Sequence, residues 1–207
     1  VDVMSRYPGS LHNHSHFSNQ TLRDCINTVE SLMDLAVELG HECVALTDHE
    51  TISGYIKAEK YYKKIKEKNP DFKCIRGNEI YLTRNGLTAK NFDKTKDGYF
   101  HFILLAKDLV GYKQICELST RAWQRSYMSR RQRRRPTYYQ DLKDIVKPNQ
   151  GHLIASSACL GSQLDKFLLR YMDTNDEKFY QTAKSWCEYI EDIFGEGNFY
   201  LELQTSN

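Results

Sequence analysis

Hydrophobic and polar positions follow two periods along this chain, and each period predicts one kind of element. Over residues 28–39 the apolar side chains recur at helical spacing, and Gly40 then favours a helix end. The next run, residues 43–46, is short and continuously apolar, as in a strand covered on both faces. An amphipathic stretch over 52–68 follows and predicts a second helix with a lysine-rich outer face.

The same patterns continue to the end of the chain and predict an α/β fold. Further strands are expected at 72–82, with an interruption at Gly77-Asn78-Glu79, and at 99–105, 153–157 and 199–203. Helices are expected after Gly111 and over 163–171 and 177–194, and residues 85–98 are expected to form a polar excursion. Because strands that alternate with helices imply parallel βα units, we predict an open or closed α/β barrel, in one domain spanning residues 1–207.

The composition narrows the class of protein without defining its chemistry. The 207 residues are 40% hydrophobic, which is enough for one large core, and the net charge of +2 indicates no particular partner. Neither a membrane-spanning apolar run nor an export signal is recognisable, so we expect a soluble cytoplasmic protein. The six cysteines never form a CxxC pair, which argues against a zinc ribbon and fits reduced thiols.

A histidine pair near the start of the chain is the first sign of chemistry. In the sequence SLHNHSHFS, His12 and His14 are two positions apart, so in an extended segment both project from one side. Two imidazoles are half of a metal site, and a mixture with carboxylates suits Zn, Mn or Fe. Taken alone, however, such a pair is more often a polar part of a solvated loop.

Four more ligand-type residues lie within or just beyond other predicted strands. They are His49, Glu79, His101 and Cys159. Because parallel strands bring their carboxyl ends to one rim, these side chains are predicted to converge with His12 and His14. The whole pattern is therefore more specific than the histidine pair.

The order of these motifs resembles a known superfamily. LHNHSHFS, LTDHE, GNE, HFILLAKD and SSACLG are similar to the metal-binding motif series of the PHP (polymerase and histidinol phosphatase) superfamily. RYPGSLHNH, LLAKDLVGY and GHLIASSACLG resemble the N-terminal domain of the bacterial DNA polymerase III alpha subunit. The resemblance spans nearly the whole chain and implies a distorted (β/α) barrel of the PHP type.

The resemblance also implies a ligand set for up to three divalent ions, Zn or Mn with Fe as a further option. The implied ligands are His12, His14, Asp24, His49, Glu79, His101 and Cys159. In this set Glu79 would bridge two ions, and a thiolate at Cys159 would favour Zn. Asp48 would orient a neighbouring histidine instead of binding metal.

The family's last motif, an Asp-x-His, is expected just beyond residues 200–204, and the printed sequence stops at Asn207. We therefore expect a barrel without its last strand. Either the chain is an N-terminal fragment of a longer polymerase or two ligands are absent.

One stretch is rich in arginine. Seven arginines lie between Arg121 and Arg135, with aromatic residues among and after them. Arginine with interleaved aromatic rings can track a phosphate backbone and stack bases. The alternative is a solvated helix surface that continues into a basic loop. A polymerase context favours nucleic acid or contact with another polymerase domain.

The resemblance implies metal-assisted phosphoester hydrolysis, with a DNA 3′ end as the plausible substrate of a 3′–5′ proofreading exonuclease, or with pyrophosphate. The implied partners are DNA, other polymerase domains and replisome subunits, with no membrane. No known motif for nucleotidyl transfer is present. Two other readings stay open: a stand-alone phosphoesterase of the histidinol-phosphatase type, and a non-catalytic structural module of the polymerase.

Overall fold

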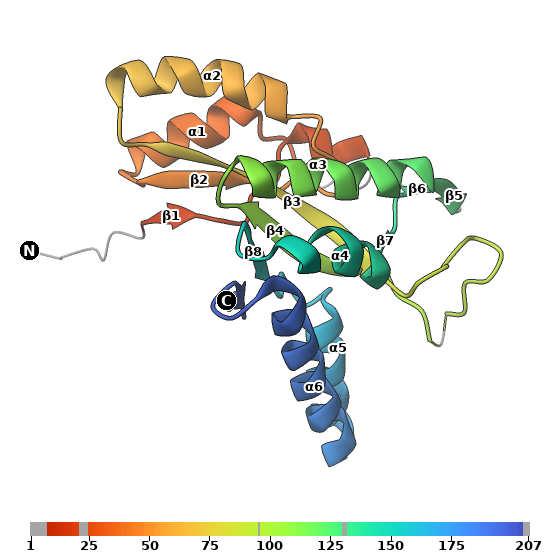
Figure 1. Ribbon diagram of the computed structural model, residues 1–207. Coiled ribbons are helices and arrows are strands. Elements are labelled where there is room, and N and C mark those ends of the chain that lie inside the picture. The colour runs from red at the N-terminus through yellow and green to blue at the C-terminus, as the bar shows by residue number, and fades with distance from the viewer. Residues whose placement is uncertain (1–7, 21–24, 95, 130–131, 205–207) are drawn as a thin grey trace, which may run out of the picture.

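The computed structural model describes residues 8–20, 25–94, 96–129 and 132–204 (Figure 1). Its main-sheet strands are β1 (Gly9–Ser10), β2 (Cys43–Leu46), β3 (Lys73–Thr83), β4 (Phe100–Ala106), β7 (Thr137–Tyr138), β8 (Leu153–Ser156) and β9 (Phe199–Tyr200). A separate hairpin is formed by β5 (Tyr127–Ser129) and β6 (Gln132–Arg134). The α-helices are α1 (Val29–Glu38), α2 (Tyr55–Lys68), α3 (Leu109–Gln124), α4 (Tyr139–Ile145), α5 (Gln163–Thr174) and α6 (Glu177–Phe194), and short 3₁₀ helices lie at His16–Gln20 and Lys147–Asn149.

The main sheet is mixed, which corrects the expectation of parallel βα units throughout. Its order is β1-β2-β3-β4-β8-β9, and β7 pairs with the far end of β3. The pairs β1–β2, β2–β3 and β8–β9 are parallel, whereas β4 is antiparallel to both β3 and β8. The described residues between β3 and β4 form no helix, and β4 returns alongside β3 as an antiparallel strand can. The α/β class holds, and the curled sheet corresponds to an incomplete barrel.

Strand β3 runs without a break through Gly77-Asn78-Glu79, so the predicted interruption is wrong. The glycine is required there by the neighbouring strand. A Cβ on Gly77 would lie 2.7 Å from the backbone oxygen of Leu104, closer than real Cβ atoms come. Gly77 therefore permits close approach of β4 and does not end the strand.

The two faces of the sheet have different partners. Ile80, Leu82, Phe102 and Leu104 belong to the large buried core shared with the helices. Side chains of alternate parity, including Ile103, form a second small apolar cluster on the opposite face. In Figure 1, α1, α2 and α3 lie along one side of the sheet, and the α5–α6 pair extends away from it. The second face is thus left open to hold polar side chains.

Helix starts follow local capping residues. The Thr28 hydroxyl accepts from Ser31 N–H at the start of α1, as a capping box does. Helix α3 begins at Leu109, earlier than expected after Gly111, because the Asp108 carboxylate accepts from the N–H groups of Val110 and Gly111. None of the helices in the described ranges has both the length and the apolar character needed to cross a membrane.

Candidate metal centre

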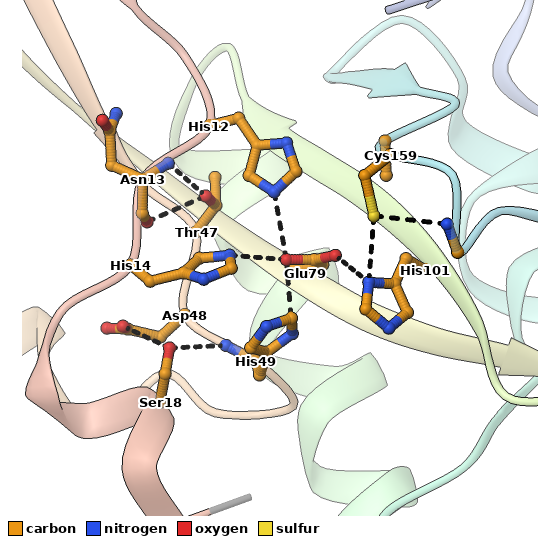
Figure 2. Close-up of polar contacts among 12 residues, drawn as sticks. His12, Asn13, His14, Ser18, Thr47, Asp48, His49, Glu79, His101 and Cys159 are labelled. Atoms are coloured by element: carbon orange, nitrogen blue, oxygen red, sulfur yellow. Dashed lines mark hydrogen bonds and ion pairs between the residues drawn. The ribbon is translucent and has the colours of Figure 1, made fainter. Parts of the chain in front are cut away.

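The carboxylate of Glu79 lies at the centre of four imidazole rings (Figure 2). Its Oε2 is 3.1 Å from His12 Nε2, 2.6 Å from His14 Nε2 and 3.2 Å from His49 Nδ1, and its Oε1 is 2.6 Å from His101 Nδ1. The Glu79 side chain is fully buried. A buried carboxylate needs partners for its lone pairs, and here all four of these contacts come from histidine rings.

His12 and His14 face Glu79 because the residue between them faces the sheet. Asn13 donates from Nδ2 to the Ala45 oxygen at 3.0 Å and from its backbone N–H to Thr47 Oγ1 at 2.8 Å. This anchors the segment beside β2. Side chains alternate along an extended backbone, so the two histidines project to the other side. The prediction from the His-x-His spacing is confirmed, although the β-strand itself covers only Gly9–Ser10.

Asp48 fixes the turn that follows the histidine pair. It is buried and accepts from the Ser15 backbone N–H at 2.6 Å, the Ser15 hydroxyl at 2.8 Å and the Ser18 hydroxyl at 2.8 Å. Ser18 Oγ in turn accepts from the His49 N–H at 3.0 Å. Asp48 therefore positions His14 and His49 through the backbone and through their neighbours Ser15 and Ser18.

His101 approaches from a strand that runs the opposite way. It is the second residue of β4, and because β4 is antiparallel its start lies beside the segment of β3 that carries Glu79. Cys159 Sγ lies 3.3 Å from His101 Nδ1, in a turn where Ala158 adopts a φ of 61°. A Cβ on Gly161 would lie 3.1 Å from the His101 ring, so the glycine lets this turn pack against the imidazole.

The charges of these groups depend on one another. Burial alone lowers the pKa of His12, but the carboxylates of Glu202 and Glu79 outweigh it and raise that pKa to about 10. Burial also lowers the pKa of His101, and contacts with Cys159 and Glu79 raise it to about 9. Burial raises the pKa of Glu79, and the surrounding histidines hold it well below its usual value. The His101 hydrogen bond lowers the pKa of the Cys159 thiol.

Among the residues that the structure describes, two groups of side chains have the spacing to hold an ion. One is His12, His14 and Glu79, and the other is His49, Glu79 and His101; within each group the ligand atoms lie within 4.8 Å of one another. Imidazole and carboxylate together suit Zn, Mn or Fe, so the residues fit the implied ions. Cys159 is adjacent to the second group through His101. Asp24 lies outside the described residues and stays a prediction.

Comparison with known proteins agrees with the motif order. The sequence model of the PHP domain matches residues 10–206. The chain belongs to the PHP domain family. This PHP domain is 34% identical over 207 residues to the DNA-directed DNA polymerase of Bacillus phage SPbeta, covering 93% of this chain and 16% of that protein. It is 34% identical over 209 residues to the DNA polymerase III subunit alpha of Aquifex aeolicus, covering 95% of this chain and 15% of that protein.

A third relative extends the same pattern. The DNA polymerase III subunit alpha of Borreliella burgdorferi is 29% identical over 197 residues, covering 94% of this chain and 15% of that protein. The PHP domain thus spans about one sixth of the length of these relatives. The predicted resemblance to the polymerase branch of the superfamily is confirmed.

One residue of the PHP domain centre was missed by sequence reasoning. Glu202 follows the edge strand β9, and its Oε1 lies 2.7 Å from His12 Nδ1 while Oε2 accepts from the Ser156 hydroxyl at 2.6 Å. The predicted strand 199–203 hid this role, because β9 ends at Tyr200 and Glu202 lies beyond it. The signal was available: Glu202 follows a strand end, as His49 and Cys159 do. Glu202 holds the ring of His12 from the side opposite Glu79.

His16 and the arginine segment have other contacts. The His16 ring lies 4.4 Å from that of Phe17 and its Nδ1 lies 3.3 Å from the Asn27 oxygen, so it is not in either ligand group. Arg121 contacts Glu117 and Asp144, and Arg125 contacts Asp141. Acidic side chains of the PHP domain itself pair with these arginines. Arg121 and Arg125 are therefore neither simply solvated nor fully available to nucleic acid.

Proposed function

We propose that this PHP domain is a metal-dependent phosphoesterase within a DNA polymerase III alpha-like polymerase, and that it cleaves the phosphodiester at a DNA 3′ end. The observation that carries the proposal is the pair of three-residue ligand groups that share Glu79. A shared carboxylate lets two ions lie close together, as two-ion phosphoester hydrolysis requires.

Each residue has a defined part in this mechanism. His12, His14 and Glu79 would hold one ion, and His49, Glu79 and His101 a second, with Cys159 beside it. When bound, such ions activate water and neutralise charge on phosphate oxygens. Asp24 is the proposed ligand from outside the described residues, for a total of up to three ions. Glu202 orients His12 so that Nε2 faces the centre, because its carboxylate occupies the Nδ1 side.

The relatives support DNA as the substrate. They are named as DNA polymerases, and a hydrolytic site for DNA ends inside a polymerase would remove misincorporated nucleotides. Pyrophosphate has the same ligand requirements and is the second candidate. The proposed partners are DNA, the remaining domains of the polymerase and other replisome subunits.

The test combines metal content with cleavage. The chain is purified without chelator, its ions are counted by elemental analysis, and 3′–5′ exonuclease activity is measured with added Zn or Mn. We expect two or more ions per chain and 3′-terminal cleavage. Glu79→Gln should lose both, whereas Glu38→Gln, on an exposed position of α1, makes the same charge change and should lose neither.

Other outcomes select the rival functions. Bound ions with hydrolysis of small phosphate esters but not of DNA would favour a phosphoesterase of the histidinol-phosphatase type. Pyrophosphate hydrolysis alone would favour the second candidate. Bound ions or none, without hydrolysis by the chain or by the complete polymerase, would overturn the proposal in favour of a structural module.

A further inference from the structure

A line of aromatic rings leads away from the metal centre along β3. Tyr81 is two residues beyond Glu79, so both side chains lie on the same face of the strand. It pairs across the sheet with His101, and the two rings stack with centroids 4.7 Å apart and planes at 13°. Tyr81 therefore borders the centre on the open face of the sheet.

Arg134 lies over this aromatic edge. Its guanidinium carbon is 5.6 Å from the Tyr81 ring centroid and 4.5 Å from that of Tyr99. Within the described ranges no carboxylate pairs with Arg134 and no hydrogen bond to its guanidinium is found, in contrast to Arg121 and Arg125. A guanidinium held by ring faces keeps its N–H donors available for a planar anion such as phosphate.

The buried neighbouring residue, Arg135, holds Arg134 in position. Arg135 is 4% exposed, its backbone N–H donates to Glu50 Oε1 at 3.1 Å, and its guanidinium carbon lies 4.0 Å from the Trp123 ring centroid. The Trp123 indole N–H donates to the backbone carbonyl oxygen of Glu50 at 3.2 Å. Because Glu50 follows His49 directly, the β5–β6 hairpin is attached to the loop that carries a proposed metal ligand.

We propose that Arg134 binds the phosphate next to the one at the metal centre, on a single nucleic-acid strand whose end lies at Glu79. The inference rests on the proposed function. Two residues of strand advance about 7 Å, whereas a metal–oxygen bond is about 2 Å, so Arg134 is placed for a neighbouring phosphate instead of the reacting one.

The rings around Arg134 select nucleic acid over a bare phosphate. Tyr99 stacks on Phe92 with centroids 5.4 Å apart and planes at 6°, and its hydroxyl bonds to that of Tyr127. Stacked, half-buried rings beside an arginine are the features with which proteins hold bases of a single strand. Contact with nucleic acid was one of two interpretations of the arginine segment, and this inference assigns that role to one residue.

The first measurement is binding without cleavage. Fluorescence anisotropy of a labelled oligo-dT is followed in chelator at several salt concentrations. Arg134→Gln should weaken binding about tenfold and lower the slope of log affinity against log salt by about one. Arg134→Lys should fall between, because lysine keeps the charge without the planar fork. Phe92→Leu should weaken oligo-dT binding without changing the salt slope.

Arg133→Gln is the matched control. Arg133 is the preceding residue of β6, it is exposed, and its Nη1 donates to Ser126 Oγ at 3.2 Å. Adjacent strand side chains point to opposite faces, so this change removes the same charge from the other side of the hairpin. Its effect on affinity should be less than twofold, with thermal unfolding of all variants confirming the fold.

The second measurement separates this inference from the proposed function. With added Mn, Arg134→Gln should raise KM for 3′-terminal cleavage of oligo-dT while leaving hydrolysis of p-nitrophenyl phosphate, which has no second phosphate, unchanged. If the unchanged chain and Arg134→Gln hydrolyse both substrates and bind oligo-dT equally well, the inference is overturned and the proposed function is not. Arg134-dependent binding without any hydrolysis would overturn the proposed function while retaining the strand site. Equal effects of Arg133→Gln and Arg134→Gln would show general charge attraction and overturn the inference.

Discussion

The histidine centre and the arginine segment are opposite kinds of cluster. His12, His49 and His101 are far apart in the sequence, yet their rings converge on the one carboxylate of Glu79. Arg121, Arg125 and Arg135 lie within fifteen positions, yet their acidic partners lie in separate elements: Arg121 and Arg125 pair with Asp141 and Asp144 of α4, whereas Arg135 pairs with Glu50. Closeness in sequence therefore says less about shared chemistry than placement at one edge of a sheet.

The difference has a physical cause. A buried carboxylate can be shared by several imidazole rings, and strands of a sheet bring their side chains to a common edge. A helix and a tight hairpin instead turn successive side chains in different directions, so the arginines of this segment do not converge on one central group. The histidine centre therefore depends on all of its members together. A single arginine contact can be lost without loss of the other arginine contacts.

The largest effect should follow loss of the shared member of the histidine centre. Because Glu79 belongs to both ligand groups, Glu79→Gln should remove ions from both together and lower phosphoester hydrolysis by at least about 100-fold. Elemental analysis and a 3′–5′ exonuclease assay measure the two losses. Retention of full metal content by Glu79→Gln would show that the histidines act independently.

Glu202 should matter less, since it contacts only one ring of the centre. Glu202→Gln leaves an amide in place of the carboxylate beside His12 Nδ1, and metal affinity should fall by about 10- to 100-fold. A competitive chelator titration measures this change. Glu196→Gln, in the turn before β9, serves as the comparison and should leave affinity unchanged.

In the arginine segment a single pair should give a loss of stability without loss of metal. Arg125 contacts the buried carboxylate of Asp141 and lies over the Tyr138 ring, 4.1 Å from guanidinium carbon to centroid. Arg125→Gln should lower the free energy of unfolding by about 2 kcal/mol, because it removes the nearer of the two guanidinium groups beside that carboxylate and leaves only Arg121, at 3.7 Å. Urea unfolding measures the change. If Arg125→Gln also lowered the metal content, the arginine segment and the histidine centre would not be independent.

The smallest effect concerns the metal-free centre and pH. Since the pKa of His12 is raised from 6.5 to about 10, its charged contacts stabilise the fold fully below about pH 6.5, and this contribution is lost as pH rises toward 10. In chelator, the Tm difference between the unchanged chain and His12→Gln should narrow by a few °C over that range. A Tm difference that widens as the pH rises would contradict the raised pKa of His12.

Much of the fold could be predicted because its signals are local. The strand at Cys43–Leu46 and the helix at Glu177–Phe194 agree with their apolar patterns at both ends. The direction of β4 could not be read in this way, because apolar periodicity carries no information on which way a strand runs. The reversal still left His101 at the correct edge, since the residue occupies the start of the strand and not its end.

Site residues that belong to a sequence motif could be predicted. Those that reach the site only through a tertiary contact could not. Glu79 and Cys159 were found from their motifs, and they lie at the centre and at its edge. Glu202 depends on the approach of the two sheet edges, β1 and β9, which no spacing along the chain encodes. The same is true of Arg134, whose guanidinium lies over two rings from separate parts of the sequence, Tyr81 and Tyr99.

Side chains alternate in direction at His12, Asn13 and His14, so the number of residues in this segment is constrained as well as their types. Asn13 holds the backbone to Ala45 and Thr47, and the two histidines face the other way only because one residue separates them. Adding or removing a single residue here would exchange the two sides, directing one histidine into the sheet and the asparagine toward Glu79. An insertion or deletion of one residue in this segment is therefore incompatible with the centre, even where every residue type is kept.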